Sequence, residues 1–398
     1  MFQILREFKI GRPQIVAGLM LLAFLAQGLW VAGSRKLSDL EYQYIASGFP
    51  QKPRQTYRVT SPMTGYAAAF PVRVINAVRP IVPDKLGSAL AIPRPWLLRL
   101  PFLIFGTWLG GALWWVARRL FDDAGGYMTL ALYCSSPAMI MASSNIGPEI
   151  ILAWSSFGLI YTAIGVAHTL YAPVRKWIPR TIILGLAIGV SMATALWSFT
   201  LVLLALGFML YLAPGRRKAV LAVVASASAI GVAVAVAASI VWLSGSTGWA
   251  SRSLLTPHLS WELVYNLKFV FVDGYMLSGS GLRDGLSVGD INSYLFVLLF
   301  IAALTTYGSW KRARYFGNTF PLVAAFAVVL VFALVPAIHI WEAVLGLSFV
   351  FLFIGGIAAD VLESASGSRL TSILTAGFAL RAVLGVVALG RWIQASPR

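Results

Sequence analysis

Residues 96–117 read WLLRLPFLIFGTWLGGALWWVA and contain one charged residue, Arg99. A helix of this length crosses a hydrocarbon core, which is about 30 Å thick and needs about 20 apolar residues. No water reaches the backbone inside a bilayer, so such a segment must pair its own N–H and C=O groups as a helix. This stretch therefore predicts a membrane-spanning helix.

Similar apolar stretches recur along the chain. The predicted spans are residues 14–33, 96–117, 125–143, 149–170, 180–195, 197–213, 218–243, 292–309, 319–338, 340–358 and 371–390. The block from 180 to 214 is continuous, and its division near Trp197 is the least well-marked boundary. We predict an all-α, polytopic membrane protein with about ten or eleven transmembrane helices, forming one domain over residues 1–398.

The composition agrees with a membrane protein. Hydrophobic residues make up 59% of the chain and charged residues 11%, against about 25% charged residues in soluble domains. The net charge of +17 would suggest nucleic acid in a soluble protein. In a membrane protein it indicates basic cytoplasmic loops and anionic lipid instead, so we expect membrane lipids and no nucleic acid as partners.

The basic residues gather at every second connection between the spans, which places the N-terminus in the cytoplasm. Two long loops, 34–95 and 244–291, then lie outside, and each carries a predicted interfacial helix, at 67–82 and 261–272. The apolar run that ends before Ser34 lacks a cleavage site and is read as a retained helix. The expected location is the inner (plasma) membrane of a bacterium.

The loop 34–95 holds nine Lys and Arg residues but only three acids. Contact with anionic headgroups explains such a loop, and so does recognition of a phosphorylated lipid substrate. Two of the acids, Asp39 and Glu41, follow the first span directly. They could bind a divalent metal or act as a base, or they could cap a short helix that begins at Ser38.

Other polar residues stand at or inside apolar segments, where they are costly and need an explanation. Glu149 follows Pro148 in a short outside turn, where it could serve chemistry or stabilise the start of a helix. Arg99 could snorkel to the surface or pair with a carboxylate, and Arg381 falls near the middle of the last span. The single Cys134 excludes a disulfide framework.

Several short motifs then occur in a fixed order over residues 14–170. They are Asp39-Leu40-Glu41-Tyr42, Ser61-Pro62-Met63-Thr64-Gly65-Tyr66, Arg99-Leu100-Pro101, Ala117-Arg118-Arg119-Leu120-Phe121, Ser136-Pro137 and Pro148-Glu149. Together they resemble the GT-C membrane glycosyltransferases, in the branch of the protein O-mannosyltransferases and lipid A aminoarabinose transferases. In that family an adjacent Asp-Glu pair stands where this chain has Asp39 and Glu41 separated by one residue.

The resemblance implies an enzyme that moves a sugar from a polyprenyl-phosphate donor to a lipid, glycan or protein acceptor. Asp39 or Glu41 would be the general base, and Glu149 would orient it or help to hold a divalent cation such as Mg²⁺ or Mn²⁺. Cations of the outer face would hold the donor phosphate, with Arg99, Arg252, Lys268, Arg283 and His339 as candidates. The chain is short for the family, so we expect a small acceptor or a partner subunit.

Three alternatives remain at this point. A non-catalytic GT-C-like membrane subunit would explain the altered acidic motif and the short chain. A lipid-linked-sugar transporter or flippase would use polar residues at mid-membrane and discontinuous helices. A polysaccharide polymerase or O-antigen ligase would use basic outer loops. No Walker, dinucleotide-binding or intramembrane-protease motif occurs.

Overall fold

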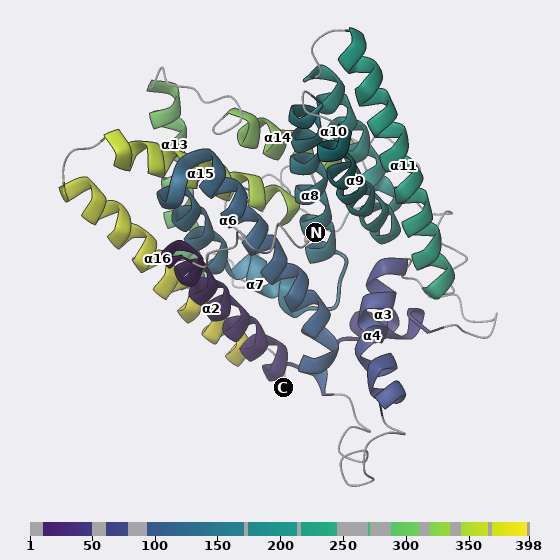
Figure 1. Ribbon diagram of the computed structural model, residues 1–398. Coiled ribbons are helices and arrows are strands. Elements are labelled where there is room, and N and C mark those ends of the chain that lie inside the picture. Colours follow the sequence, from purple (N-terminus) through teal and green to yellow (C-terminus); the bar gives the residue numbers. More distant parts are fainter. Residues whose placement is uncertain are drawn as a thin grey trace.

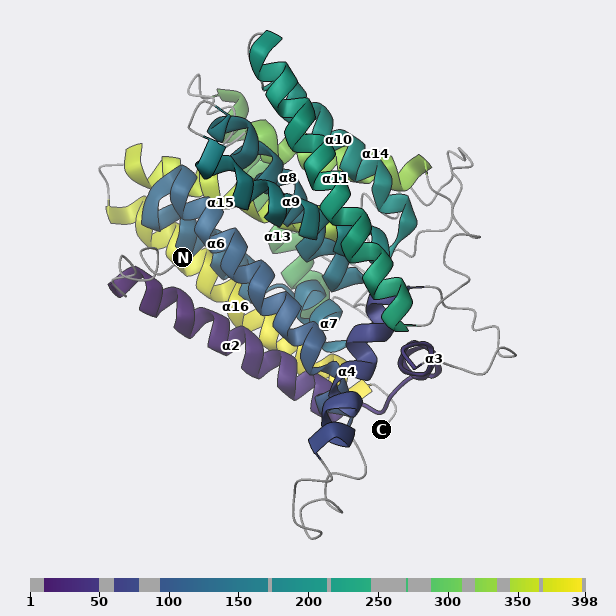
Figure 2. The same cartoon turned by 45° about the vertical axis from the view of Figure 1, so that its right-hand side comes forward.

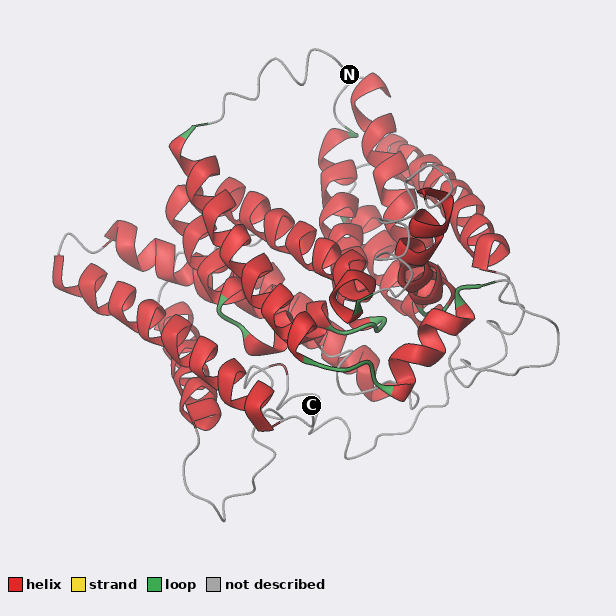
Figure 3. Cartoon of the chain, turned by 90° about the horizontal axis from the view of Figure 1, so that it is seen from below, coloured by secondary structure: helices red, strands yellow, loops and turns green. Residues whose placement is uncertain are grey.

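The structure, a computed structural model, describes residues 11–49, 61–78, 94–170, 174–212, 216–244, 270, 288–309, 319–334, 344–364 and 368–395. The regular structure of these residues is helical, with no strand among them (Figure 3). Arg252, Lys268, Arg283 and His339 lie outside the described residues, as does all of the predicted helix at 261–272 except Val270.

Every predicted span contains a helix. The helices are α2 (Arg12–Ser34), α3 (Asp39–Ser47), α4 (Pro62–Val78), α6 (Pro95–Cys134), α7 (Pro137–Ser144), α8 (Glu149–Thr169), α9 (Val174–Thr194), the 3₁₀ turn η2 (Leu196–Ser198), α10 (Phe199–Tyr211), α11 (Arg216–Ser244), α13 (Val288–Ser309), α14 (Phe320–Leu334), α15 (Val344–Ser364) and α16 (Ser368–Ala395) (Figures 1 and 2). The division of the 180–214 block is confirmed, because η2 separates α9 from α10.

Seven helices in the described part of the chain are long and apolar enough to cross a membrane. Shorter apolar helices, Ile178–Thr194 and Phe199–Tyr211, lie beside them. Large apolar side chains such as Leu19 of α2 and Val234 of α11 are exposed, as lipid-facing positions should be. The protein is an integral membrane protein of the all-α class.

The helix α6 is a tight hairpin of two arms rather than one straight rod. Its backbone leaves the helical region at Phe121 and Asp122, so the predicted spans 96–117 and 125–143 fold back on each other. The Tyr133 hydroxyl donates to the Gly106 carbonyl across the two arms. The side chain of Arg118 pairs with Asp123 beside the turn.

We expect Asp122→Gly to stabilise the protein. Asp122 has φ 61° and ψ −166°, a region that only glycine enters without strain of about 1–3 kcal/mol. Glycine costs about 0.5–1 kcal/mol in chain entropy, so a net gain of about 1 kcal/mol should remain. Thermal unfolding in detergent would measure it, and Asp122→Ala, which removes the carboxylate but keeps the strain, should show no gain.

The predicted span 125–143 is wrong in its continuity. The helix stops at Cys134, and α7 starts anew at Pro137, with the Ser136 side chain accepting from the Met139 N–H as its N-cap. Proline cannot donate to the preceding turn, which explains the break. The α16 helix packs closely against this break: a Cβ at Gly385 would collide with the Ser135 carbonyl.

The centre of the bundle is α15, which is buried from Val344 to Asp360. It packs against both arms of α6 and against α8 (Figure 2). Glycines make the close approach to α6 possible, since a Cβ at Gly355 would meet Thr129 and one at Gly356 would meet the Phe121 ring. This core fixes the relative positions of α6 and α8, whose ends build the site.

Two shorter helices, α3 and α4, lie together at one end of the bundle (Figure 1). A Cβ at Gly48 would meet the Gly65 carbonyl, so only glycine allows this approach. Arg73 of α4 donates to the carbonyls of Gly48 and Leu243, which ties both helices to the end of α11. A helix thus exists where the interfacial helix was predicted, but it begins at Pro62 rather than at residue 67.

Candidate functional site

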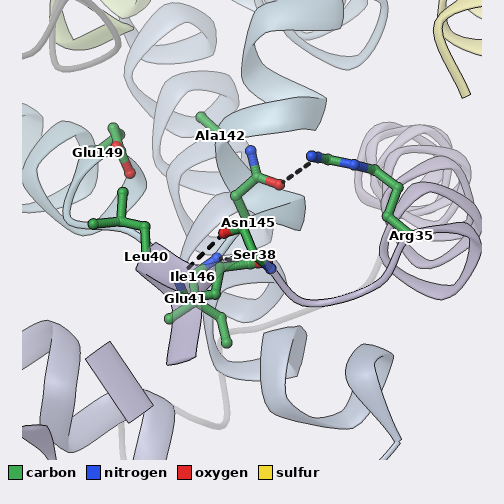
Figure 4. Close-up of a pocket in the computed structure, with 8 residues that line it drawn as sticks. All are labelled: Arg35, Ser38, Leu40, Glu41, Ala142, Asn145, Ile146 and Glu149. Carbon is green, nitrogen blue, oxygen red and sulfur yellow. Dashed lines mark hydrogen bonds between the residues drawn. The ribbon is translucent and has the colours of Figure 1, made fainter. Parts of the chain in front are cut away.

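A pocket of about 150 Å³ opens at the end of the bundle where α2 ends and α8 begins (Figure 4). The charge pattern predicts that this end is extracytoplasmic. The lining residues are Arg35, Ser38, Leu40, Glu41, Ala142, Asn145, Ile146 and Glu149. Two of the three predicted catalytic acids, Glu41 and Glu149, are therefore brought together from opposite ends of the 34–149 segment.

The chain enters the pocket through the start of α3. Ser38 is the N-cap, and its Oγ accepts a hydrogen bond from the Glu41 N–H. The Ser38 N–H donates in return to Glu41 Oε2 at 2.8 Å, which completes a capping box. The capping interpretation of the Ser38-to-Glu41 segment is confirmed, and it turns the Glu41 carboxylate inward.

Glu41 forms a buried ion pair with Arg99 of α6. Arg99 Nε donates to Glu41 Oε1 at 2.8 Å, and Arg99 Nη2 donates to Oε2 at 2.7 Å. The other Arg99 N–H groups donate to the carbonyls of Ala32, Arg35 and Lys36. A guanidinium has five N–H hydrogens, and each one has an acceptor. Arg99 thus offers no N–H to a phosphate, contrary to the ligand role predicted for it.

The Glu41 carboxylate is equally saturated. Oε1 accepts from Arg99 and from the Ile146 N–H at 3.1 Å, and Oε2 accepts from Arg99 and Ser38. Four hydrogen bonds fill the four lone-pair positions of a carboxylate. Burial disfavours the charged form, but the bonds and charge of Arg99 outweigh it and lower the pKa of Glu41. Glu41 is a positioning residue that joins α3, α6 and the α7–α8 turn.

The lowered pKa of Glu41 predicts a pH-dependent stability. A carboxyl whose pKa is lower in the folded state stabilises the fold above its unfolded pKa, about 4.3, and loses this contribution as the pH falls through the folded value. We expect the difference in thermal midpoint between wild type and Glu41→Gln to be constant from pH 7 to about pH 5 and to shrink below about pH 4. An unchanged difference at acid pH would contradict the expectation.

Glu149 is the first residue of α8 and lies on the side of the pocket away from Arg35 (Figure 4). Its carboxylate folds back over Gly147, where a Cβ would collide with it. It occupies the helix-start position that the sequence suggested. Among the described residues Glu149 has no ion-pair partner, and its side chain lines the pocket.

Asp39 is the first residue of α3 and is exposed. It stands between Ser38 and Leu40, which both line the pocket. No hydrogen bond or ion pair joins Asp39 to another described side chain. Of the two acids in the Asp39-to-Glu41 motif, only Glu41 is therefore held by partners within the described part of the chain.

Two residues of the pocket lining, Arg35 and Asn145, and the neighbouring Trp392 were not predicted as site residues from the sequence. Arg35 Nη1 donates to Asn145 Oδ1 at 2.9 Å, and the Arg35 guanidinium lies 4.4 Å from the centre of the Trp392 ring. In the sequence Arg35 is one of the loop cations that could offset Asp39 and Glu41, and Asn145 is part of the short turn before Glu149. Residues 35, 145 and 392 are too far apart in sequence for a local pattern to connect them.

The acids do not form a ready metal site. No group of three His, Cys, Asp or Glu side chains in the described ranges could hold a metal ion. The donor chemistry gives a reason, because all four lone-pair positions of Glu41 accept hydrogen bonds. The predicted metal role of Asp39, Glu41 and Glu149 thus does not fit Glu41, and no step is assigned to a metal.

Comparisons with known proteins complement this geometry. No protein-family model matches the sequence, and no curated protein matches it. The crystal structure of ArnT from Cupriavidus metallidurans bound to undecaprenyl phosphate is similar, with a TM-score of 0.60 and 14% identity over 94% of this chain and 77% of that chain. The fold is that of the GT-C glycosyltransferases.

Archaeal oligosaccharyltransferase has the same GT-C fold. The Archaeoglobus fulgidus enzyme tethered with an acceptor peptide has a TM-score of 0.57 and 12% identity, over 96% of this chain and 55% of that one. Its complex with an inhibitory peptide and a dolichol-phosphate has a TM-score of 0.54. This chain spans little more than half the length of the oligosaccharyltransferase.

Within the GT-C fold, not every intramembrane charge belongs to the pocket. Arg381 of α16 is fully buried, with its guanidinium 4.4 Å from the Phe296 ring centre and 5.9 Å from that of Phe351. It does not line the pocket. Arg381 lies near the middle of α16 (Ser368–Ala395), and its aromatic contacts join α13, α15 and α16.

Proposed function

We propose that this protein is a membrane glycosyltransferase that takes its sugar from a polyprenyl-phosphate-linked donor at the extracytoplasmic face. One observation carries the proposal: in a GT-C fold, the pocket between α3 and α8 is lined by Glu149, which has no ion-pair partner among the described residues, and a second carboxyl group, Asp39, lies at its edge. The similar structures include ArnT with undecaprenyl phosphate and the archaeal enzyme with a dolichol-phosphate.

In the proposed reaction Asp39 is the general base. It takes the proton of an acceptor hydroxyl as that oxygen attacks the anomeric carbon of the sugar. The bond between this carbon and the phosphate oxygen breaks, and polyprenyl phosphate leaves with the electron pair. Glu149 accepts a hydrogen bond from the acceptor or the sugar and orients it. Glu41, held by Arg99, fixes the backbone from which Asp39 projects.

The test is sugar transfer by purified protein reconstituted in liposomes. Radiolabelled polyprenyl-phosphate sugars would be supplied with a membrane extract as acceptor. Transfer of label, or release of free sugar, supports the enzyme. Movement of intact donor across the bilayer without bond cleavage would instead indicate a flippase, and a folded protein that turns over no donor would indicate a non-catalytic subunit.

A further inference from the structure

We propose that Arg35, held by Trp392 and Asn145, binds the phosphate group of the lipid-linked donor. This inference rests on the proposed function and assigns to Arg35 the role that the sequence suggested for Arg99. Among the described residues that line the pocket, Arg35 is the only cation. It is the C-cap of α2, where an extended backbone (φ −120°, ψ 141°) ends the helix and directs the chain toward the pocket.

Two contacts from segments that are distant in sequence fix the Arg35 side chain before a ligand binds. The hydrogen bond to Asn145 comes from the α7–α8 turn, and the cation–π contact with Trp392 comes from α16. An arginine held in one orientation loses less conformational entropy when it binds a ligand. A cation–π contact with an aromatic ring also leaves the N–H groups of the guanidinium open for a phosphate.

The hydrogen-bond inventory separates Arg35 from Arg99. All five N–H hydrogens of Arg99 have protein acceptors. The side-chain contact of Arg35 with Asn145 uses one N–H group, and no ion pair links Arg35 to another described residue. Planar N–H pairs of this kind match two phosphate oxygens.

The local charge favours an anion as well. Arg35 and Arg99 repel each other, and Glu41 lies close enough to attract both. Glu41 is already in direct contact with Arg99, and Glu149 lies on the side of the pocket away from Arg35 (Figure 4), so neither carboxylate forms an ion pair with Arg35. A phosphate placed beside Arg35 would neutralise its charge. The same contact would stabilise the negative charge that develops on the leaving group during transfer.

The experiment measures binding, not turnover, on the full-length protein in detergent. The probes are a polyprenyl phosphate without sugar, inorganic phosphate and phosphatidylglycerol, and the readout is the ligand-dependent rise in thermal midpoint. Arg35→Gln removes the charge, Arg35→Lys keeps the charge without the planar fork, and Trp392→Leu removes the aromatic partner. Lys36→Gln is the matched control, because it removes an exposed charge one residue away.

We expect Arg35→Gln to weaken polyprenyl-phosphate binding by about 10- to 100-fold, the loss of a charged hydrogen bond. Arg35→Lys and Trp392→Leu should bind more weakly than wild type, and Lys36→Gln should bind equally well. A parallel loss of inorganic phosphate binding would support phosphate as the recognised group, and a loss for the polyprenyl lipid alone would support the lipid-linked form.

Wild-type affinity in folded Arg35→Gln would overturn the inference, and so would equal losses in Lys36→Gln or a wild type that prefers phosphatidylglycerol. If Arg35→Gln fails to fold, Arg35→Lys and Trp392→Leu decide in the same way. Because no sugar is transferred, failure here leaves the proposed function standing. Absent turnover with intact Arg35-dependent binding would reject the transferase but not the phosphate site.

Discussion

Arg99→Met is expected to destabilise the protein by about 3–5 kcal/mol, the cost of leaving one member of a buried ion pair without its partner. The change would leave the buried Glu41 carboxylate without its ion-pair partner and three backbone carbonyls without donors. Thermal unfolding of the purified protein and the yield of monodisperse protein would both report it. Arg99→Lys should not rescue the fold fully, because an ammonium has three N–H hydrogens for five acceptors.

A double-mutant cycle separates the pair from its surroundings. Glu41→Gln and Arg99→Met should each destabilise the protein, and the double variant should be destabilised by less than the sum. Additive effects would show that the two side chains contribute independently. Arg73→Gln, which also removes hydrogen bonds to backbone carbonyls but no buried ion pair, is the control for loss of a tethering arginine.

Asp39→Asn is expected to lower the rate of sugar transfer by about 10²- to 10⁴-fold, the usual contribution of a general base. Asp39 is exposed and has no described partner. The free energy of unfolding should therefore change by no more than the loss of a helix-start charge, about 0.5 kcal/mol. The measurement is single-turnover transfer in liposomes at saturating donor, with the thermal midpoint of the same preparation.

Glu41→Gln and Glu149→Gln complete this comparison. Glu41→Gln should lose stability first, and any transfer that the folded fraction retains should not show the full loss seen in Asp39→Asn. Glu149→Gln should keep the fold, because a glutamine can still accept a hydrogen bond. It should reduce transfer, because a glutamine carries no charge. Full activity of Asp39→Asn would reject Asp39 as the base.

The acidic motif shows where sequence reasoning stops. The residues Asp39, Leu40 and Glu41 indicate two carboxylates at the membrane surface, and the resemblance leaves open which one is catalytic. The choice between them depends on the hydrogen bonds that Arg99 and the Ile146 N–H donate to the Glu41 carboxylate. Those partners lie 58 and 105 residues away along the chain, so no local pattern reports them.

Arg99 and Arg35 also show which features of the site the sequence could and could not predict. Arg99 stands out in the sequence because a charge in an apolar helix is costly, and the alternative that it pairs with a carboxylate is confirmed. Arg35 does not stand out, since it is one of nine cations in a loop. Only the packing of α16 against α2 brings Trp392 to it.

The sequence by itself determined the membrane class, the all-α fold, the position of the spans and the candidate acids. These follow from hydropathy, charge and short-range spacing, because the bilayer forces each apolar stretch to satisfy its own backbone. The tertiary structure decided the commitment of Glu41 and Arg99 to each other and the place of Arg35 in the pocket. Each of these depends on contacts between helices distant in sequence, where the donors and acceptors of one side chain are filled by groups that only the packed bundle brings together.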